Sequence, residues 1–497
     1  MNNTRHLPCI AALVLALARA ASATGGGPPP PGVDPLVPDQ ALVRLAPSVA
    51  IGDFLASFNA AFPGTTVIGE IASRKTYKLA LPVGAPMGAV EAQLLQQVAQ
   101  GALVWGELNY QGQAAEGKTD SIWVSQLNID QPQYAGQYAV ALLGLAAAQQ
   151  GSQGQGVLVA VLDTGIDAAH PALAGRIATG GANFVDGGGT DDVGDGLDND
   201  GDGLVDEMVG HGTFVAGLVA LVAPQAKLVP VKVLDSEGIG DTFSIAQGIY
   251  HAIDRGVQVI NCSFGSTYKG EAVHDAVIEA DSKGIVVVGA SGNFDREEPE
   301  EFPALISGAL GIGATTKGDL KASFSNYNHK LALCAPGESQ AVDGAPGVFD
   351  PAKSVISALP GGGYGVWRGT SFATAFVSGA AALVRAQHPG APPTHATAAL
   401  VSSALLDSAV PIDALNPPYA GLLGDGRVNA AAAVALAPAA PQVGDLNGDG
   451  QVNGADLGLL LGNWGPCSGA PMCAGDLDLD GTVDGADLGL LLGLWMG

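Results

Sequence analysis

The apolar run Val157-Leu-Val-Ala-Val-Leu162, followed at once by Asp163-Thr-Gly165, decides how the central part of this chain folds. Three further runs are mostly apolar: 228–233, 257–260 and 285–290. Continuous apolar runs suit strands that are buried on both faces of a parallel sheet. Helix-length segments separate them, for example 243–255 and 271–282. We therefore expect an α/β fold with an open, doubly wound and mostly parallel sheet.

Three short segments, in a fixed order along the chain, supply a carboxylate, an imidazole and a hydroxyl, each near a glycine. They are Val161-Leu-Asp163-Thr-Gly-Ile-Asp167, His211-Gly-Thr-Phe-Val-Ala-Gly217 and Gly369-Thr-Ser371-Phe-Ala-Thr-Ala375. A serine hydroxyl is a weak nucleophile at neutral pH and needs a base, which His211 can supply. Asp163 can hold the imidazole and stabilise its charged form. Asp163 follows an expected strand, and active sites of doubly wound sheets lie at the carboxyl ends of strands.

The order aspartate, histidine, serine is that of subtilisin-like enzymes and differs from the chymotrypsin and α/β-hydrolase orders. On these motifs the chain resembles the subtilase family (peptidase S8) over residues 157–384. The resemblance implies a serine endopeptidase that cuts protein or peptide substrates through an acyl-enzyme, with Asp163, His211 and Ser371 as its catalytic triad. The alternative is an inactive protein of subtilase fold that acts at a surface or in an assembly through its C-terminal module.

Two further segments resemble parts of the same family. In Gly289-Ala-Ser-Gly-Asn293, the resemblance implies that Asn293 donates its side-chain amide to the oxyanion. The alternative is that Asn293 only caps a turn after glycine. Asn261-Cys-Ser-Phe-Gly265 resembles the segment that pairs with an extended peptide substrate. The substrate-binding residues that we expect are Ser263, Phe264, Gly265 and Gly292.

Carboxylates are concentrated in two stretches of this acidic chain, whose formal net charge is −27 at pH 7. Nine lie in residues 186–207 and eight in 445–487, and neither stretch contains a lysine or an arginine. The excess of negative charge argues against a general nucleic-acid binder, because phosphate would be repelled. Carboxylate clusters without counter-charge usually bind cations. The alternative is a solvated acidic surface loop.

The second acidic stretch is an internal repeat, since residues 444–462 return almost unchanged as 475–493. Each copy has oxygen-bearing side chains at the spacing of a calcium loop, with a glycine at the sharp turn. The expected Ca²⁺ ligands of the first copy are Asp445, Asn447, Asp449, Gln451 (through its carbonyl), Asn453 and Asp456. Those of the second copy are Asp476, Asp478, Asp480, Thr482 (through its carbonyl), Asp484 and Asp487.

With Leu-Gly-Leu-Leu-Leu-Gly after each loop, the tail resembles a type I dockerin. The resemblance implies a cohesin-like partner. The alternative is a calcium-rigidified tail or attachment module without a cohesin, because Gly454-Ala455 and Gly485-Ala486 replace the hydroxyl-bearing pair common in cohesin-reading dockerins.

A third loop of this kind lies between Asp163 and His211. Its expected Ca²⁺ ligands are Asp198, Asp200, Asp202 and Asp206. The loop lacks an oxygen-bearing side chain at its twelfth position, where Val209 stands. Calcium would be structural at all these loops, and we expect no cofactor for catalysis.

The N-terminus has the pattern of a secretory signal peptide, with an apolar run at 7–20 and the cleavage pattern Ala21-Ser-Ala23. A membrane anchor is the weaker alternative, because this run is too short to span a bilayer. No later run reaches about 18 uninterrupted apolar residues. We therefore expect a protein that is secreted or associated with the cell surface, without a membrane span.

Residues 41–109 can be drawn as a β-α-β-β-α-β unit, the ferredoxin-like arrangement. Its expected strands are 41–45, 66–71, 76–81 and 103–109, and its expected helices are 51–62 and 87–99. Subtilase propeptides, which act as folding templates and inhibitors, resemble this unit. The alternative is an ordinary accessory domain.

The expected organisation has five parts. They are a signal peptide (1–23), a linker with an inhibitor-like propeptide (24–118), a catalytic domain (119–438), a linker (439–444) and dockerin-like repeats (445–497). Cys9 leaves with the signal peptide. Cys467 and Cys473 bracket a short loop between the repeats and are the expected disulfide pair. Cys262 and Cys334 lie in apolar strand contexts, where buried free thiols are expected.

Overall fold

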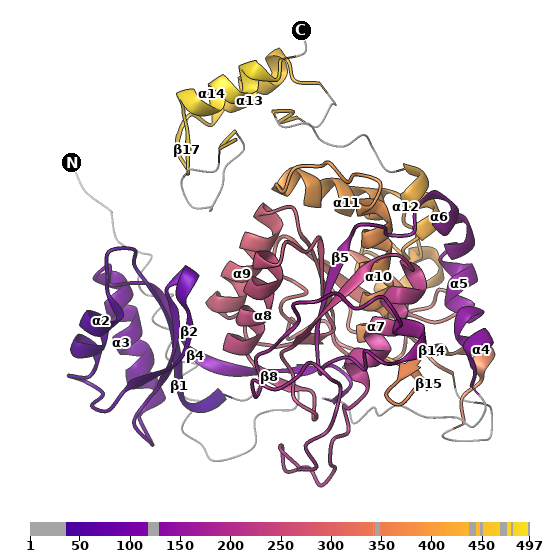
Figure 1. Cartoon of the computed structure of the whole chain (residues 1–497), viewed down its shortest axis with the longest axis horizontal. Helices are drawn as coiled ribbons and strands as arrows, with labels where there is room; N and C mark the ends of the chain where they lie inside the picture. The colour runs from indigo at the N-terminus through magenta and orange to yellow at the C-terminus, as the bar shows by residue number, and fades with distance from the viewer. Residues whose placement is uncertain are drawn as a thin grey trace. The chain divides into compact units, whose positions relative to one another are not determined.

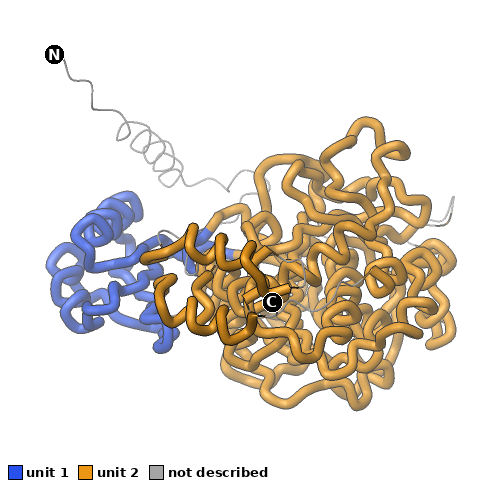
Figure 2. The backbone as a smooth tube through the Cα atoms, turned by 90° about the horizontal axis from the view of Figure 1, so that it is seen from above, with its two compact units in different colours: residues 1–111, 270–272 blue, residues 112–269, 273–497 orange. Residues whose placement is uncertain are grey.

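The computed structural model describes residues 36–117, 129–340, 342, 348–436, 444–447, 451–467, 475–478 and 481–495. The expected signal peptide lies outside these residues, and so do Asp449, Asp480 and Cys473. The chain forms two compact units, coloured in Figure 2. The first comprises residues up to Gln111 with Gly270–Ala272, and the second comprises Gly112–Lys269 with Val273–Gly497.

The first unit is built on an antiparallel sheet with the strand order β4-β1-β3-β2. Its elements are β1 (Leu36–Leu45), α2 (Ile51–Phe58), β2 (Thr66–Ile71), a 3-10 turn (Ala72–Arg74), β3 (Thr76–Ala80), α3 (Met87–Ala99) and β4 (Leu103–Ala114). This is the β-α-β-β-α-β order that the sequence predicts. The sheet and both helices share one apolar core, to which α2 contributes Phe54 and Phe58 and α3 contributes Val90 and Leu94.

Two boundaries differ from the predicted ones. Helix α2 ends at Phe58 instead of continuing to residue 62. Its end is fixed by Asn59, whose amide donates to the Leu55 carbonyl and whose Oδ1 accepts from the N–H groups of Gly64 and Thr65. Strand β4 continues past residue 109 to Ala114, because its last residues pair with a strand that is remote in the sequence.

The second unit is built on a parallel sheet with the strand order β13-β12-β11-β9-β5-β7-β6. The strands are β5 (Leu158–Asp163), β6 (Ala182–Asn183), β7 (Lys227–Lys232), β9 (Val259–Cys262), β11 (Val286–Ala290), β12 (Ala309–Thr315) and β13 (Leu333–Pro336). The four apolar runs correspond to β5, β7, β9 and β11, so the predicted doubly wound sheet is confirmed. Strand β5 lies between β7 and β9, which makes its carboxyl end a switch point where such sheets bind ligands.

Helices cover both faces of this sheet. Figure 1 shows α8 (Thr242–Asp254) and α9 (Glu271–Ser282) on one side of β5, and α7 (His211–Val222) and α10 (Thr370–Arg385) on the other. Every residue of α10 is buried. Helices α7 and α10 approach closely because Gly379 has no side chain, since a Cβ there would lie 2.5 Å from the Cβ of Val222. This close packing holds the two helices against each other.

Shorter elements complete the second unit. They are α4 (Gln131–Ala135), α5 (Tyr138–Leu142), α6 (Leu145–Gly151), β8 (Ile239–Asp241), β10 (Phe264–Gly265), β14 (Val355–Leu359), β15 (Gly363–Trp367), α11 (His395–Asp407) and α12 (Ala430–Leu436), with 3-10 turns at Pro171–Leu173, Pro351–Lys353, Asp413–Leu415 and Pro417–Tyr419. None of the helices within the described ranges is both long and apolar enough to cross a membrane. Cys262 and Cys334 are buried and free, as predicted, and burial raises the pKa of both thiols.

The C-terminal repeats form two similar halves. They contain α13 (Gly454–Gly462), α14 (Gly485–Gly493), and the strands β16 (Gly465–Pro466) and β17 (Thr482–Val483), which pair with each other. Val452, Leu460, Val483 and Leu491 form their shared core. Cys467 is disulfide-bonded, and its expected partner, Cys473, lies outside the described residues.

Candidate active site

Asp163 is the last residue of β5 and His211 is the first residue of α7. The structure brings them together, with Nδ1 of His211 at 2.7 Å from Oδ1 of Asp163. Both side chains are fully buried. The same Asp163 oxygen accepts a hydrogen bond of 2.8 Å from the Thr164 N–H. The imidazole is thus held by a buried carboxylate, which fixes its orientation.

A second buried carboxylate, Asp192, joins the segments on which these two residues lie. Its Oδ1 accepts from the Thr164 hydroxyl at 3.0 Å and from the Gly210 N–H at 2.9 Å. Its Oδ2 accepts from the N–H and the hydroxyl of Thr213 at 2.9 and 2.6 Å. Burial raises the pKa of Asp192, against the lowering effect of these hydrogen bonds. No sequence pattern indicated this role, because Asp192 is one of nine carboxylates in its acidic stretch.

Aromatic side chains exclude water from the imidazole. Trp367 meets the ring of His211 edge to face, with centroids 5.4 Å apart, and Phe372 lies at 5.6 Å. Phe214 packs on Phe372 with ring centroids 4.6 Å apart. All three aromatic side chains are buried. Burial by itself lowers the pKa of His211, but the carboxylates of Asp163 and Glu116 raise it by more, to about 10.

Ser371 lies in the first turn of α10, and its hydroxyl donates to a carboxylate that sequence reasoning missed. The acceptor is Oε2 of Glu116, at 2.5 Å from the Ser371 Oγ. The same oxygen lies 3.0 Å from Nε2 of His211. Glu116 is fully buried. Its carboxylate therefore occupies the place between the serine hydroxyl and the imidazole. Only its position, just beyond the expected last strand of the first unit, could have drawn attention to it.

Asn293 follows β11 and points its amide at the other oxygen of Glu116. Its Oδ1 accepts from both the N–H and the hydroxyl of Thr370, each at 2.9 Å, which fixes the orientation of the amide. Its Nδ2 then donates to Oε1 of Glu116 at 3.0 Å. A Cβ on Gly369 would lie 1.6 Å from that oxygen, so a residue without a side chain is needed there. A donor aimed at a buried negative oxygen can stabilise an oxyanion.

The predicted substrate-binding segment pairs with the end of β4. Strand β10 is antiparallel to it, with Phe264 opposite Ala114 and Gly265 opposite Gln113. On the other side, the Ala114 N–H donates to the Gly238 carbonyl at 2.9 Å, and β8 also pairs with β4. An extended segment of this chain therefore lies between two strands of the second unit.

The remaining predicted substrate-binding residues lie around the same site. The Ser263 hydroxyl donates to the Ser371 carbonyl at 2.8 Å, and the Ser263 carbonyl is a second acceptor for the Ser371 hydroxyl at 2.9 Å. Gly292 has φ = 99°, a conformation that favours glycine, and its N–H lies 3.2 Å from the Thr370 hydroxyl. All four residues thus lie next to the helix that carries Ser371 or next to the extended segment: Ser263, Phe264, Gly265 and Gly292.

The inserted acidic loop brings together three of its four predicted ligands. Oxygens of Asp198, Asp200 and Asp202 lie within 4.8 Å of one another and of a carboxylate oxygen of Glu237, which the sequence did not indicate. The fourth, Asp206, is turned away, since its carboxylate accepts from the N–H groups of Asp195 and Gly196, each at 3.0 Å. Burial, and then the neighbouring Glu237, raise the pKa of Glu207 to about 8.

The two C-terminal loops repeat one arrangement around a buried aspartate. Asp456 accepts from the N–H groups of Leu446, Asn447 and Asn453, and Asp487 accepts from those of Leu477, Asp478 and Asp484. Burial raises the pKa of Asp456, but its backbone hydrogen bonds lower it by more. Oxygens of Asp476, Asp478 and Asp487 lie within 4.8 Å of one another, and Asp445 is buried like Asp476.

Four other residues of the tail were predicted to bind calcium, two through side chains and two through carbonyls. Asn453 and Asp484 cap α13 and α14, accepting from the N–H groups of Ala455 and Ala486. Gln451 and Thr482 lie within the two loops, at the position where only the backbone carbonyl is expected to bind calcium.

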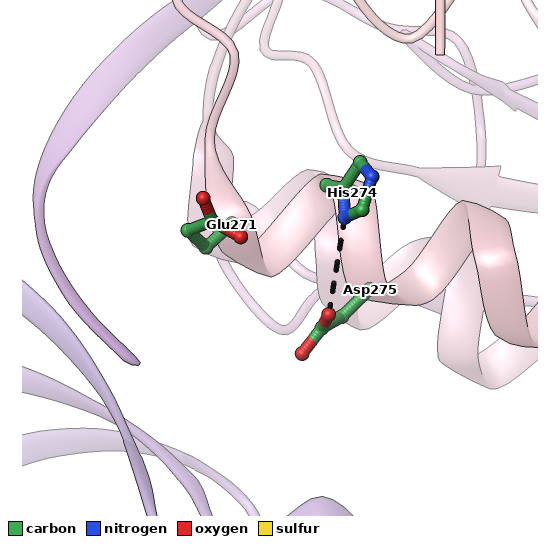
Figure 3. A group of neighbouring side chains, drawn as sticks. All are labelled: Glu271, His274 and Asp275. Atoms are coloured by element: carbon green, nitrogen blue, oxygen red, sulfur yellow. Dashed lines mark ion pairs between the residues drawn. The ribbon is translucent and has the colours of Figure 1, made fainter. Parts of the chain in front are cut away.

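One further cluster, at the start of α9, adds nothing to the site. Figure 3 shows Glu271, His274 and Asp275 on the first turns of this helix, with His274 facing Asp275. The His274 Nδ1 and the Asp275 Oδ1 are 4.0 Å apart, and the two side chains are 31% and 24% exposed. At that distance and exposure the pair is an ordinary surface contact.

Known proteins are similar to this chain in sequence and in fold. Residues 154–442 match the Subtilase family. The chain is 37% identical over 297 residues to Subtilisin BL of Lederbergia lenta, covering 58% of this chain and 94% of that protein. It is 37% identical over 247 residues to an intracellular serine protease of Paenibacillus polymyxa, covering 47% and 68%. A solved protease structure from Pseudoalteromonas arctica is 30% identical, with a TM-score of 0.53 and coverage of 62% and 98%. The chain therefore belongs to the subtilase family and is a subtilisin-like serine endopeptidase.

Proposed function

We propose that Ser371 is the nucleophile of a secreted serine endopeptidase, with His211 as general base and acid and Asp163 as the residue that orients the imidazole. The supporting observation is the Glu116 carboxylate, which is bound at once by Ser371, His211 and Asn293. These three groups converge on two oxygens of one carbon. In the tetrahedral intermediate of serine attack, one carbon likewise carries two oxygens, that of the serine and the oxyanion.

The reaction then follows from the positions of these groups. The Ser371 oxygen attacks the carbonyl carbon as His211 takes its proton, and the imidazolium formed is stabilised by Asp163. The oxyanion accepts from the Asn293 amide, a contact that contributes about 3–4 kcal/mol to lowering the barrier. His211 gives its proton to the leaving amine, and an acyl-enzyme remains. Water, deprotonated by His211, then releases the acid and restores the serine.

The substrate is an extended polypeptide that adds a strand between β8 and β10. The end of β4 already occupies this position, with main-chain pairing on both sides. Backbone hydrogen bonds of this kind recognise any extended chain, whereas side-chain pockets give preference. The competing function, an inactive protein of this fold, is disfavoured because Asp163 contacts His211, and because Ser371, His211 and Asn293 converge on one carboxylate.

The first unit is proposed to be the predicted propeptide, that is, an inhibitor of the enzyme that is removed by cleavage. Extending the antiparallel register of Gln113 and Ala114 by one residue puts Ala115 opposite Ser263, whose carbonyl accepts from the Ser371 hydroxyl. Ala115 and Glu116 are both buried. The bond between them is therefore the proposed cleavage point. Until it is cut, the Glu116 carboxylate occupies the position of a substrate carbonyl.

Calcium is proposed to bind at the inserted loop and in the dockerin-like tail, in each case as a structural ion. In the tail, Asp476, Asp478 and Asp487 already converge, and carboxylate oxygens are the ligands that Ca²⁺ prefers. The dockerin-like spacing supports attachment to a cohesin-like module, outside the cell or at its surface. The signal peptide is the basis for proposing secretion.

Replacing Ser371 by Ala is expected to abolish hydrolysis of casein, because no other hydroxyl takes its place beside His211. Replacing Asn293 by Ala should leave activity that is lower by about 10²–10³ in kcat. Rates on a peptide amide, with a serine-directed phosphonate to count active sites, separate the two variants. Full activity of the Ser371→Ala protein would overturn the assignment of the nucleophile.

Secreted enzyme is expected to begin at Glu116, and the Ser371→Ala protein to keep its first unit, because it cannot cut the Ala115–Glu116 bond. N-terminal sequencing and intact mass measure both. A fully active enzyme that begins at Thr24 contradicts the inhibitor role. Cleavage at another bond between residues 111 and 133 contradicts only the choice of the Ala115–Glu116 bond, which is based on the strand register.

The uncut Ser371→Ala protein is expected to lose stability as pH rises from about 6.5 to about 10. The pKa of His211 is raised when folded, so its contribution is complete below the unfolded value and is lost as pH rises through the folded one. Adding Glu116→Gln should make this loss smaller, because one of the two carboxylates is removed. Urea denaturation at several pH values gives the free energy of unfolding. Glu298→Gln is the control, and an equal effect of both substitutions would refute the argument.

Replacing Asp487 by Ala is expected to remove one Ca²⁺ from the tail without changing casein hydrolysis, because catalysis uses other residues. The buried carboxylate both converges with Asp476 and Asp478 and holds three backbone N–H groups. Isothermal titration calorimetry counts the ions, and Asn463→Ala is the control from the same tail. Unchanged calcium binding would contradict the ligand assignment.

A further inference from the structure

Glu237 is a buried carboxylate at the edge of the inserted acidic loop. It is fully buried in the turn that precedes β8. Its Oε1 accepts from the Asp206 N–H at 2.6 Å. Its Oε2 is also buried and accepts from no N–H or alcohol group in the described part of the chain, and the side chain beside it is the carboxyl group of Glu207. Two carboxyl groups that meet in this way need a shared proton or a cation, and a cation can also neutralise the acidic loop next to them.

That side chain reaches into the inserted acidic loop. A carboxylate oxygen of Glu237 lies within 4.8 Å of oxygens of Asp198, Asp200 and Asp202. Ca²⁺ binds oxygens at about 2.3–2.6 Å, so ligands on opposite sides of one ion are about 5 Å apart. The loop's own twelfth residue is Val209, which offers no side-chain oxygen. Glu237 supplies from another loop the carboxylate that is missing from this one.

The turn that carries Glu237 is also an edge of the substrate site. Its next residue, Gly238, accepts the Ala114 N–H at 2.9 Å. The turn is held by Asp235, whose Oδ1 accepts from the N–H groups of Glu237 and Ile239 at 3.0 and 2.8 Å. Ile239 is the first residue of β8. A displacement of the Glu237 side chain by neighbouring negative charge would therefore move the carbonyl that binds the peptide.

We propose that Glu237 completes a calcium site with Asp198, Asp200 and Asp202, and that calcium bound there strengthens the binding of extended peptide substrates. This rests on the proposed calcium binding by the inserted loop. It adds Glu237 as a ligand and stronger binding of peptide substrates as a consequence. Calcium removes the repulsion among four converging carboxylates and holds the turn in the position that presents the Gly238 carbonyl. By linkage, bound peptide must strengthen calcium binding by the same factor.

The effect depends on the length of the substrate. Gly238 contacts the residue that is second before the proposed cleavage point, so a peptide must extend that far to use it. A peptide amide with three or more residues before the cleaved bond should have a lower KM with calcium than with chelator. Its kcat should change by less than about twofold, because the contact is the same in ground and transition states. An ester of a single amino acid does not reach Gly238, and its KM should not respond.

The test uses the active enzyme with Asp456→Ala and Asp487→Ala, so that calcium binding by the tail does not interfere. Isothermal titration calorimetry measures the affinity for Ca²⁺ alone. Glu237→Gln should weaken it by at least about 10-fold and should remove the response of KM to calcium. Asp186→Asn, which removes a charge from the same stretch outside the cluster, should retain the parent affinity. If Glu237→Gln does not fold, Glu237→Asp, which retains the charge on a shorter side chain, should give an intermediate affinity.

Three outcomes distinguish a wrong role for Glu237 from a failure of the proposed calcium loop. If Asp200→Asn abolishes calcium binding but Glu237→Gln binds as tightly as the parent, the loop holds calcium and the role of Glu237 is wrong. If calcium binds through Glu237 and KM for the long peptide is the same with chelator, the link to the substrate edge is wrong. If the parent itself binds no calcium, the proposed calcium loop fails, and the inference with it.

Discussion

The hydrogen bond between Asp163 and His211 is the contact on which the catalytic part of this molecule depends. It joins a buried carboxylate to a buried imidazole, and such a pair is stable only if both groups are held in place and shielded from water. The parallel sheet holds the first at the end of β5, and the packing of α7 against α10 holds the second. Asp192 then ties the residue after Asp163 to those around His211. The aromatic side chains of Trp367 and Phe372 exclude water.

A third carboxylate, that of Glu116, shares this pocket, and in the proposed propeptide it is the group that would block the protease site of its own chain. Negative charge at this position is favourable because three donors converge there and because it helps to keep the imidazole charged. Of these donors, the Asn293 amide is the one proposed to stabilise an oxyanion during catalysis. A carboxylate is a poor electrophile, however, so it occupies the site without reacting. If the chain is processed as proposed, the uncut form would have a site that is satisfied electrostatically and unavailable to substrate.

The charge of the chain has several physical roles. At the active site, buried carboxylates orient a base and receive fixed hydrogen bonds. In the inserted loop, carboxylates converge from two separate loops, so a divalent cation is the natural counter-charge. In the tail, Asp456 and Asp487 organise the backbone of each repeat by accepting three N–H groups. The net charge of −27 therefore comes in large part from local clusters of carboxylates and is not spread evenly over the surface.

The sequence by itself determined the parallel sheet, the β-α-β-β-α-β order of the first unit and the family. Apolar periodicity and short motifs are local, and each could be read without knowing what it packs against. Asp163, His211, Ser371 and Asn293 were likewise indicated by motif. Glu116, Asp192 and Glu237 were not, because each takes its place from contacts between segments that are remote in the chain. A single aspartate or glutamate has no neighbouring sequence motif that marks it as functional. Only the tertiary structure decided which carboxylates were buried, and burial gives a carboxylate a specific partner and a function.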